Sequence, residues 1–196
     1  MDITQVKQFH GHMCPGLAIG IRVAELAIAE MGDRPGDEEV VAIVETDNCA
    51  VDAIQFITGC TFGKGNLIHL DYGKNAFRFI RRRDNKAIRI RLKSDAMKPL
   101  KPDEDQRLQR WREGNASEME KQEVMRLQKE RAELILKAQI TDLLEVQSIP
   151  PEIPDRARIF NSLACARCGE KVMETRLHLL EGKVYCTECF QQLLKS

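Results

Sequence analysis

The cysteines of this 196-residue chain divide it into two ends, and both ends are able to bind metal. There are seven cysteines, and a long middle stretch contains none. They are, in two groups, Cys14, Cys49 and Cys60, then Cys165, Cys168, Cys186 and Cys189. Disulfides are rare inside cells, so metal binding or thiol chemistry is the leading reason for so many cysteines in an intracellular chain.

Charge and composition exclude several classes of function. Lysine plus arginine and aspartate plus glutamate each number 30, so the net charge is zero and there is no strong basic field for nucleic acid or an anionic membrane. The 31% charged and 43% hydrophobic residues are typical of a folded, soluble protein. No apolar run reaches the roughly 18 residues of a membrane span, and no secretory signal is evident. We therefore expect a cytoplasmic protein without membrane contact.

The C-terminal cysteines form two CxxC pairs that are separated by 17 residues. This spacing is typical of a structural zinc site, because each CxxC turn presents two thiolates to one ion. The four ligands are Cys165, Cys168, Cys186 and Cys189. They close the coordination sphere, so we expect Zn²⁺ to be structural and not catalytic. Two disulfides, or iron in the same cage, are the alternatives.

The segment between the two CxxC pairs predicts a hairpin. Residues 171–180 and 183–185 are its expected arms, and a short helix is expected over 190–194. So short a module cannot bury a self-sufficient core, so the metal must supply much of its folding energy. Residues 161–196 are therefore expected to form a small zinc-ribbon or treble-clef-like domain.

The middle of the chain is predicted to be helical. Residues 98–147 are rich in Glu, Lys, Arg, Gln and Leu, and Ser117 with Glu120 forms a capping-box pattern. We expect a helix from there to Val146. Its apolar positions do not follow a heptad, so we interpret it as an arm that packs on the core or on a second subunit, which favours a homodimer. Residues 148–160 are an extended, proline-rich linker.

The first 97 residues predict a core domain of the α/β or α+β class. The expected helices cover residues 3–10, 15–31 and 50–58, and the expected strands cover 40–44, 66–71, 76–81 and 86–92. The strand at 40–44 is apolar throughout, which is typical of a strand buried on both faces. A basic strand face that includes Arg89 and Arg91 is a candidate for nucleic-acid binding, and a solvated edge is the simpler interpretation.

Two imidazoles and a thiol lie within five residues, directly before a helix. These residues are His10, His12 and Cys14, and Pro15 then occupies the first turn. Cys14 is expected at the helix N-cap, where the helix dipole favours the thiolate. His12 and Cys14 are close enough in the chain to reach one metal ion.

A second motif lies between residues 45 and 66. Cys49 begins a helix just after the buried strand, and Cys60 follows eleven residues later on the same side. Asp52 shares that face and is a candidate for orienting a ligand or acting as a base. Lys64, between two glycines, is a candidate for binding an anionic cofactor.

Together these motifs predict a second metal site in the N-terminal domain. The expected ligands are His12, Cys14, Cys49 and Cys60, with His10 as the alternative ligand. The residues alone do not identify the metal. If the site is catalytic, the candidates are Cys14, Cys49 and Asp52.

The stretches HGHMCPGLAIGIRVAELA and ETDNCAVDAIQFITGCTFGKGNL resemble the FmdE family, which takes its name from one of the subunits of molybdenum formylmethanofuran dehydrogenase. The resemblance covers residues 5–95, and the two CxxC pairs resemble the zinc-finger module of some family members. The matching motif residues are His12, Cys14, Gly16, Cys49, Asp52, Gln55, Gly59, Cys60, Gly63, Gly65 and Asn66.

The resemblance implies an α+β core with a mixed sheet flanked by helices, loosely like thioredoxin. It implies an accessory role, in metal handling or in the assembly of a molybdenum or tungsten enzyme of one-carbon metabolism, and partners among the subunits of such an enzyme. Two other hypotheses remain. One is an enzyme that uses a Cys/His site, and the other is a zinc module that binds nucleic acid or a regulatory protein.

Overall fold

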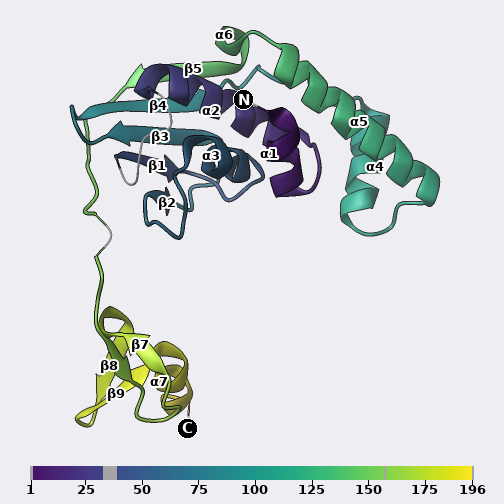
Figure 1. The fold of residues 1–196 in the computed structure, drawn as a ribbon. Coiled ribbons are helices and arrows are strands. Elements are labelled where there is room, and N and C mark those ends of the chain that lie inside the picture. The colour runs from purple at the N-terminus through teal and green to yellow at the C-terminus, as the bar shows by residue number, and fades with distance from the viewer. Residues whose placement is uncertain (1, 33–38, 157, 196) are drawn as a thin grey trace. The chain divides into compact units, whose positions relative to one another are not determined.

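The computed structural model describes residues 2–32, 39–156 and 158–195. The chain forms two compact units, Met1–Arg156 and Ala157–Ser196 (Figure 1). Within the described residues, no helix has the length and the apolar character that crossing a membrane requires.

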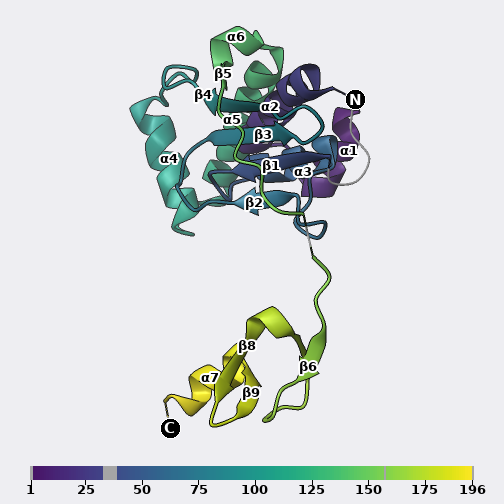
Figure 2. The ribbon, with the colours of Figure 1, turned by 90° about the vertical axis from the view of Figure 1, so that its left-hand side faces the viewer.

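The first unit is built on one five-stranded sheet. Its order is β2-β1-β3-β4-β5, which Figure 2 shows from bottom to top. The strands are β1 (Val40–Val44), β2 (Leu67–His69), β3 (Ala76–Arg81), β4 (Lys86–Leu92) and β5 (Leu144–Ser148). β1 and β2 are parallel and the other neighbours are antiparallel, so the sheet is mixed. The predicted α+β class is confirmed, although β2 is shorter than the expected strand at 66–71.

Six helices accompany this sheet in the described part of the unit. They are α1 (Ile3–His10), α2 (Pro15–Met31), α3 (Ala50–Thr58), α4 (Pro102–Arg112), α5 (Glu118–Lys137) and α6 (Ile140–Leu143). Local signals set several ends. Cys14 caps α2, and Ser117 with Glu120 forms the capping box of α5, as predicted.

The prediction that the long helix continues to Val146 is wrong. α5 ends at Lys137, Ala138 is extended, and Leu144–Ser148 form β5, which pairs antiparallel with β4. Without β5, the backbone groups along that edge of β4 would lack partners, and Val146 is a strand-forming residue that lies opposite Ile90. Pairing with the sheet therefore outweighs the local helix propensity.

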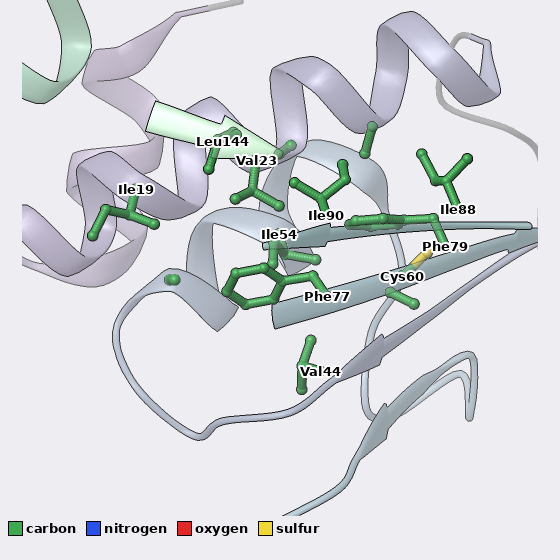
Figure 3. Packing of buried hydrophobic residues seen from close by; sticks show 14 of the residues in the cluster. Ile19, Val23, Val44, Ile54, Cys60, Phe77, Phe79, Ile88, Ile90 and Leu144 are labelled. Atoms are coloured by element: carbon green, nitrogen blue, oxygen red, sulfur yellow. The ribbon is translucent and has the colours of Figure 1, made fainter. Parts of the chain in front are cut away.

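The core lies between the sheet and the helices α2 and α3. Figure 3 shows Val23 and Ile54 from these helices packed against Phe77 and Ile90 of the sheet. The helices approach each other closely at Gly20, where an added Cβ would lie only 2.6 Å from the Cα of Ala50. This contact brings the N-terminal end of α3 next to α2.

The second face of the sheet carries a buried carboxylate. Glu45 is 1% exposed and accepts two hydrogen bonds from Arg89, at 2.9 and 2.8 Å, and one from Arg78 at 3.0 Å. These hydrogen bonds, from Arg89 first, hold the pKa of Glu45 below its ordinary value of 4.5. Arg91 pairs with Glu145. Arg78, Arg89 and Arg91 of this strand face are thus engaged in ion pairs within the fold.

The proline-rich segment after β5 crosses that second face (Figure 2). Ile149 donates its N–H to the carbonyl of Ala87 at 3.0 Å and packs against the apolar patch around Ile80. Further on, Arg82 Nη1 donates to the carbonyl of Pro154 at 2.7 Å. The start of the segment is therefore fixed to the first unit.

The second unit is a small module of two hairpins and one helix. Its elements are β6 (Ser162–Ala164), β7 (Lys171–Met173), a 3-10 turn (Glu174–Arg176), β8 (Leu177–Leu180), β9 (Lys183–Cys186) and α7 (Thr187–Leu193). The predicted turn at Glu181 and Gly182 joins β8 to β9. The residues expected to extend the first arm of that hairpin, 171–173, instead pair with β6.

Candidate metal centres

Two groups of metal-ligating side chains gather among the described residues. Ligand atoms within each group lie within 4.8 Å of one another. One group, here called the four-cysteine site, consists of Cys165, Cys168, Cys186 and Cys189. The other, here called the N-terminal cluster, consists of His10, His12 and Cys14.

The four-cysteine site is organised by backbone N–H groups. Cys186 donates its N–H to the sulfur of Cys165 at 3.3 Å, and Cys189 donates to the sulfur of Cys186 at 3.4 Å. The backbone N–H groups of Cys168 and Cys186 lower the pKa of Cys165 to about 6. Four converging thiols of this kind match the tetrahedral sulfur cage of structural zinc.

The thiols of this site do not ionise equally easily. The pKa of Cys189 is raised to about 12 by its hydrogen bond with Cys186 and by burial. Several negative sulfurs this close together repel one another, and a cation between them offsets that repulsion. The sequence prediction of a closed, metal-dependent module fits this geometry.

A reversal of the chain after α1 creates the N-terminal cluster (Figure 1). His10 is the last residue of α1, and Gly11 ends the helix with a φ of 98°, a conformation that favours glycine. The chain then returns so that His12 lies beside His10, with ring centroids 4.6 Å apart. Cys14 caps α2, and its sulfur accepts the N–H of Leu17 at 3.4 Å.

Asp52 fixes the orientation of His10. Its Oδ2 lies 2.7 Å from His10 Nδ1, and the other ring nitrogen, Nε2, lies 3.9 Å from the sulfur of Cys14. With Nδ1–H donated to the carboxylate, Nε2 presents its lone pair to the cluster. Carboxylate–histidine pairs of this kind support the ligands of many metal sites.

Cys49 lies beside the cluster without belonging to it. A Cβ added to Gly16 would lie 3.8 Å from the sulfur of Cys49 and 3.9 Å from that of Cys14. Burial, followed by the negative charge and hydrogen bond of Cys14, raises the pKa of Cys49 to about 11.

Two predicted site residues lie elsewhere. Cys60 is 1% exposed, donates to the carbonyl of Val40 at 3.4 Å, and packs in the core (Figure 3). The nine residues of α3 separate it from Cys49 by about 13 Å, too far for one ion. Lys64 lies in the turn beyond the C-terminal end of α3, whereas the cluster lies at its N-terminal end. His10, the alternative ligand in the sequence prediction, belongs to the N-terminal cluster, whereas Cys60 does not.

The fold and its sites define a two-domain class of protein, in which an α+β core with a His/Cys cluster precedes a four-cysteine zinc-finger module. The particular family follows from the sequence. Residues 9–145 match the model of FmdE, molybdenum formylmethanofuran dehydrogenase operon, and the chain belongs to this family. Residues 158–193 match the prokaryotic dksA/traR C4-type zinc finger.

Two known proteins are similar over most of this chain. A protein of Archaeoglobus fulgidus named probable S-adenosyl-L-methionine-binding protein is 33% identical over 184 residues. The match covers 89% of this chain and 50% of that protein, so this chain spans about half the length of the relative. A tungsten formylmethanofuran dehydrogenase FmdE-like protein from Syntrophus aciditrophicus superposes with a TM-score of 0.64 at 26% identity. That match covers 97% of this chain and 90% of the other.

Proposed function

We propose that the N-terminal cluster binds a divalent transition-metal ion reversibly, and that the chain serves as an accessory protein for metal handling beside a molybdenum or tungsten enzyme. The observation that carries the proposal is the convergence of His10, His12 and Cys14 within 4.8 Å, with Asp52 behind His10. Imidazole and thiolate ligands suit zinc and its neighbours in the first transition row.

The cluster differs from a structural cage in its openness. It offers three ligands rather than four, His12 is exposed, and Cys14 is half-buried. A site with three protein ligands keeps a coordination position for a water molecule or another ligand. Such a position allows an ion to be exchanged with a partner, whereas four thiolates enclose theirs.

The accessory role is proposed from the comparisons. The family model is named for a formylmethanofuran dehydrogenase operon, and the similar structure is described as resembling one component of a tungsten enzyme of that name. We propose that this chain delivers or stores an ion for an enzyme of that class. The same proposal includes two predictions from the sequence: that this chain forms a homodimer, and that its partners are subunits of such an enzyme.

Counting metal in the full chain tests this function. Protein purified without oxygen is expected to contain two equivalents of metal, one for each site. The double variant His12→Ala, Cys14→Ser should retain one equivalent. The double variant Cys186→Ser, Cys189→Ser should also retain one, and Cys60→Ala, the matched control in the core, should retain two. One equivalent in the unmodified chain, unchanged on loss of His12 and Cys14, would contradict the proposal.

A further inference from the structure

The thiols of Cys14 and Cys49 form a pair that metal binding alone does not explain. Both sulfurs lie within 4 Å of the position that a Cβ of Gly16 would occupy. They come from different segments, the N-cap of α2 and the N-cap of α3. Gly16 has no side chain, so the two sulfurs are able to occupy the space between the starts of α2 and α3.

The two cysteines have different surroundings. The sulfur of Cys14 accepts the N–H of Leu17 at the start of the 17-residue helix α2. Cys49 makes no such capping hydrogen bond. Both side chains are half-buried, so a small reagent reaches them. Cys60, by contrast, is enclosed in the core.

We propose that Cys14 and Cys49 form a reversible disulfide, and that its formation expels the ion from the N-terminal cluster. The oxidant is a low-molecular-weight disulfide. The Cys14 thiolate attacks one of its sulfurs, which forms a mixed disulfide and releases one small thiol. The Cys49 thiolate then attacks the sulfur of Cys14, which forms the Cys14–Cys49 bond and releases the second small thiol.

The chemistry is balanced and linked to the metal. Two protein thiols are oxidised, the small disulfide is reduced by two electrons, and the two thiol protons end on the two released thiols. A disulfide sulfur is not a thiolate, so Cys14 ceases to be a ligand. The remaining pair, His10 and His12, lacks the third ligand of the cluster. This second step rests on the proposed function, whereas disulfide formation does not.

Peptide mapping of the full chain tests the pairing. Trypsin cuts after Arg22 and separates Cys14 from Cys49, but leaves Cys49 and Cys60 in one peptide. The variant Cys60→Ala removes this ambiguity. Metal-free Cys60→Ala protein treated with oxidised glutathione is expected to give the cross-linked pair of peptides, which dithiothreitol separates again. In Cys49→Ser, glutathione should instead remain attached to Cys14.

The metal content separates failure of this inference from failure of the proposed function. We expect saturating Zn²⁺ to suppress the cross-link, and oxidation to lower the zinc content of Cys60→Ala from two equivalents to one. Persistent glutathione on Cys14, without a cross-link while two equivalents of zinc bind the reduced protein, would overturn the inference alone. A cross-link in protein that binds only one equivalent when reduced would support the disulfide and overturn the metal function.

Discussion

The two candidate metal centres stand in opposite relations to the fold around them. Among the described residues of the second unit, only Cys165 and Cys189 are buried, and both belong to the four-cysteine site. The first unit instead buries large side chains such as Phe77 and Phe79 completely, and neither belongs to its cluster. In the second unit the metal must organise the fold, whereas in the first the fold organises the ligands.

This difference determines what each centre is able to do. Four thiolates hold an ion on which their own domain depends, so release of the ion means unfolding. A cluster assembled at the end of α1 and the start of α2, on an independent core, is able to exchange its ion while the domain stays folded. The comparison therefore predicts that the two centres respond differently to the same perturbation.

Removing one ligand of the four-cysteine site should have the largest effect. We expect Cys186→Ser to lose zinc and to unfold residues 158–195, because structural zinc contributes about 10–16 kcal/mol to modules of this kind. The unfolding transition of the first unit should not move. Zinc content and the dispersion of backbone amide signals measure the two effects. A second unit that stays folded without zinc would break the comparison.

The first unit should depend on its buried ion pairs instead. Glu45→Gln is expected to lower its free energy of unfolding by about 3–5 kcal/mol, because Arg78 and Arg89 lose their charged partner. Glu145→Gln is the control, since its pair with Arg91 is partly exposed and should cost less than about 1 kcal/mol. Urea unfolding measures both, and equal losses would contradict this account of the core.

The same carboxylate makes the first unit sensitive to acid. The folded pKa of Glu45 is lowered, so its contribution to stability is fully present above the ordinary value of 4.5. That contribution is lost as the pH falls through the lowered folded pKa. As the pH is lowered from above 4.5 to below it, the free energy of unfolding should therefore decline more steeply for the unmodified chain than for Glu45→Gln. Parallel profiles would exclude Glu45 as the source.

The close contact between α2 and α3 should contribute to the stability of the first unit, although the residues that form it are small. Gly20→Ala places a Cβ against the backbone of Ala50 and is expected to cost about 1–3 kcal/mol, because the helices must separate. Gly63→Ala is the matched control, since no atom lies within 4 Å of its added Cβ. Urea unfolding compares the two variants. A Gly20→Ala protein as stable as the control would show that the helices separate at no cost.

The last predicted effect concerns Asp52, which supports the N-terminal cluster. Asp52→Asn should weaken zinc binding there by about 10–100-fold, because His10 loses the carboxylate that orients its ring. The fold should persist, and so should zinc in the second unit. Competition with a chromophoric chelator measures the affinity, with Asp47→Asn as an exposed control. Unchanged affinity in Asp52→Asn would remove this residue from the site.

Much of the fold was predictable because its signals are local. Pro15 and Gly32 delimit α2, and the capping box starts α5, because each depends on residues a few positions apart. The local sequence pattern does not predict β5, because that strand forms on the edge of β4, more than fifty residues earlier in the chain. Hydrogen bonding to a distant strand leaves little trace in the local pattern.

The candidate sites likewise differ in whether their sequence signals are local. The four-cysteine spacing is local and predicted its cluster directly. The pair of His10 with Asp52 joins residues that are 42 positions apart, and only the packing of α1 against α3 brings them together. The sequence prediction groups Cys60 with Cys49 by assuming one continuous helix, but α3 ends at Thr58, and Gly59 turns the chain before Cys60.

X-ray absorption at the zinc edge tests the central claim most directly. It should be measured on the full chain carrying Cys186→Ser and Cys189→Ser, in which any zinc at full occupancy must lie outside the four-cysteine site. The account predicts one equivalent of zinc with a mixed shell of imidazole nitrogen and thiolate sulfur, from His10, His12 and Cys14. No bound zinc, or a shell of oxygen alone, would contradict it.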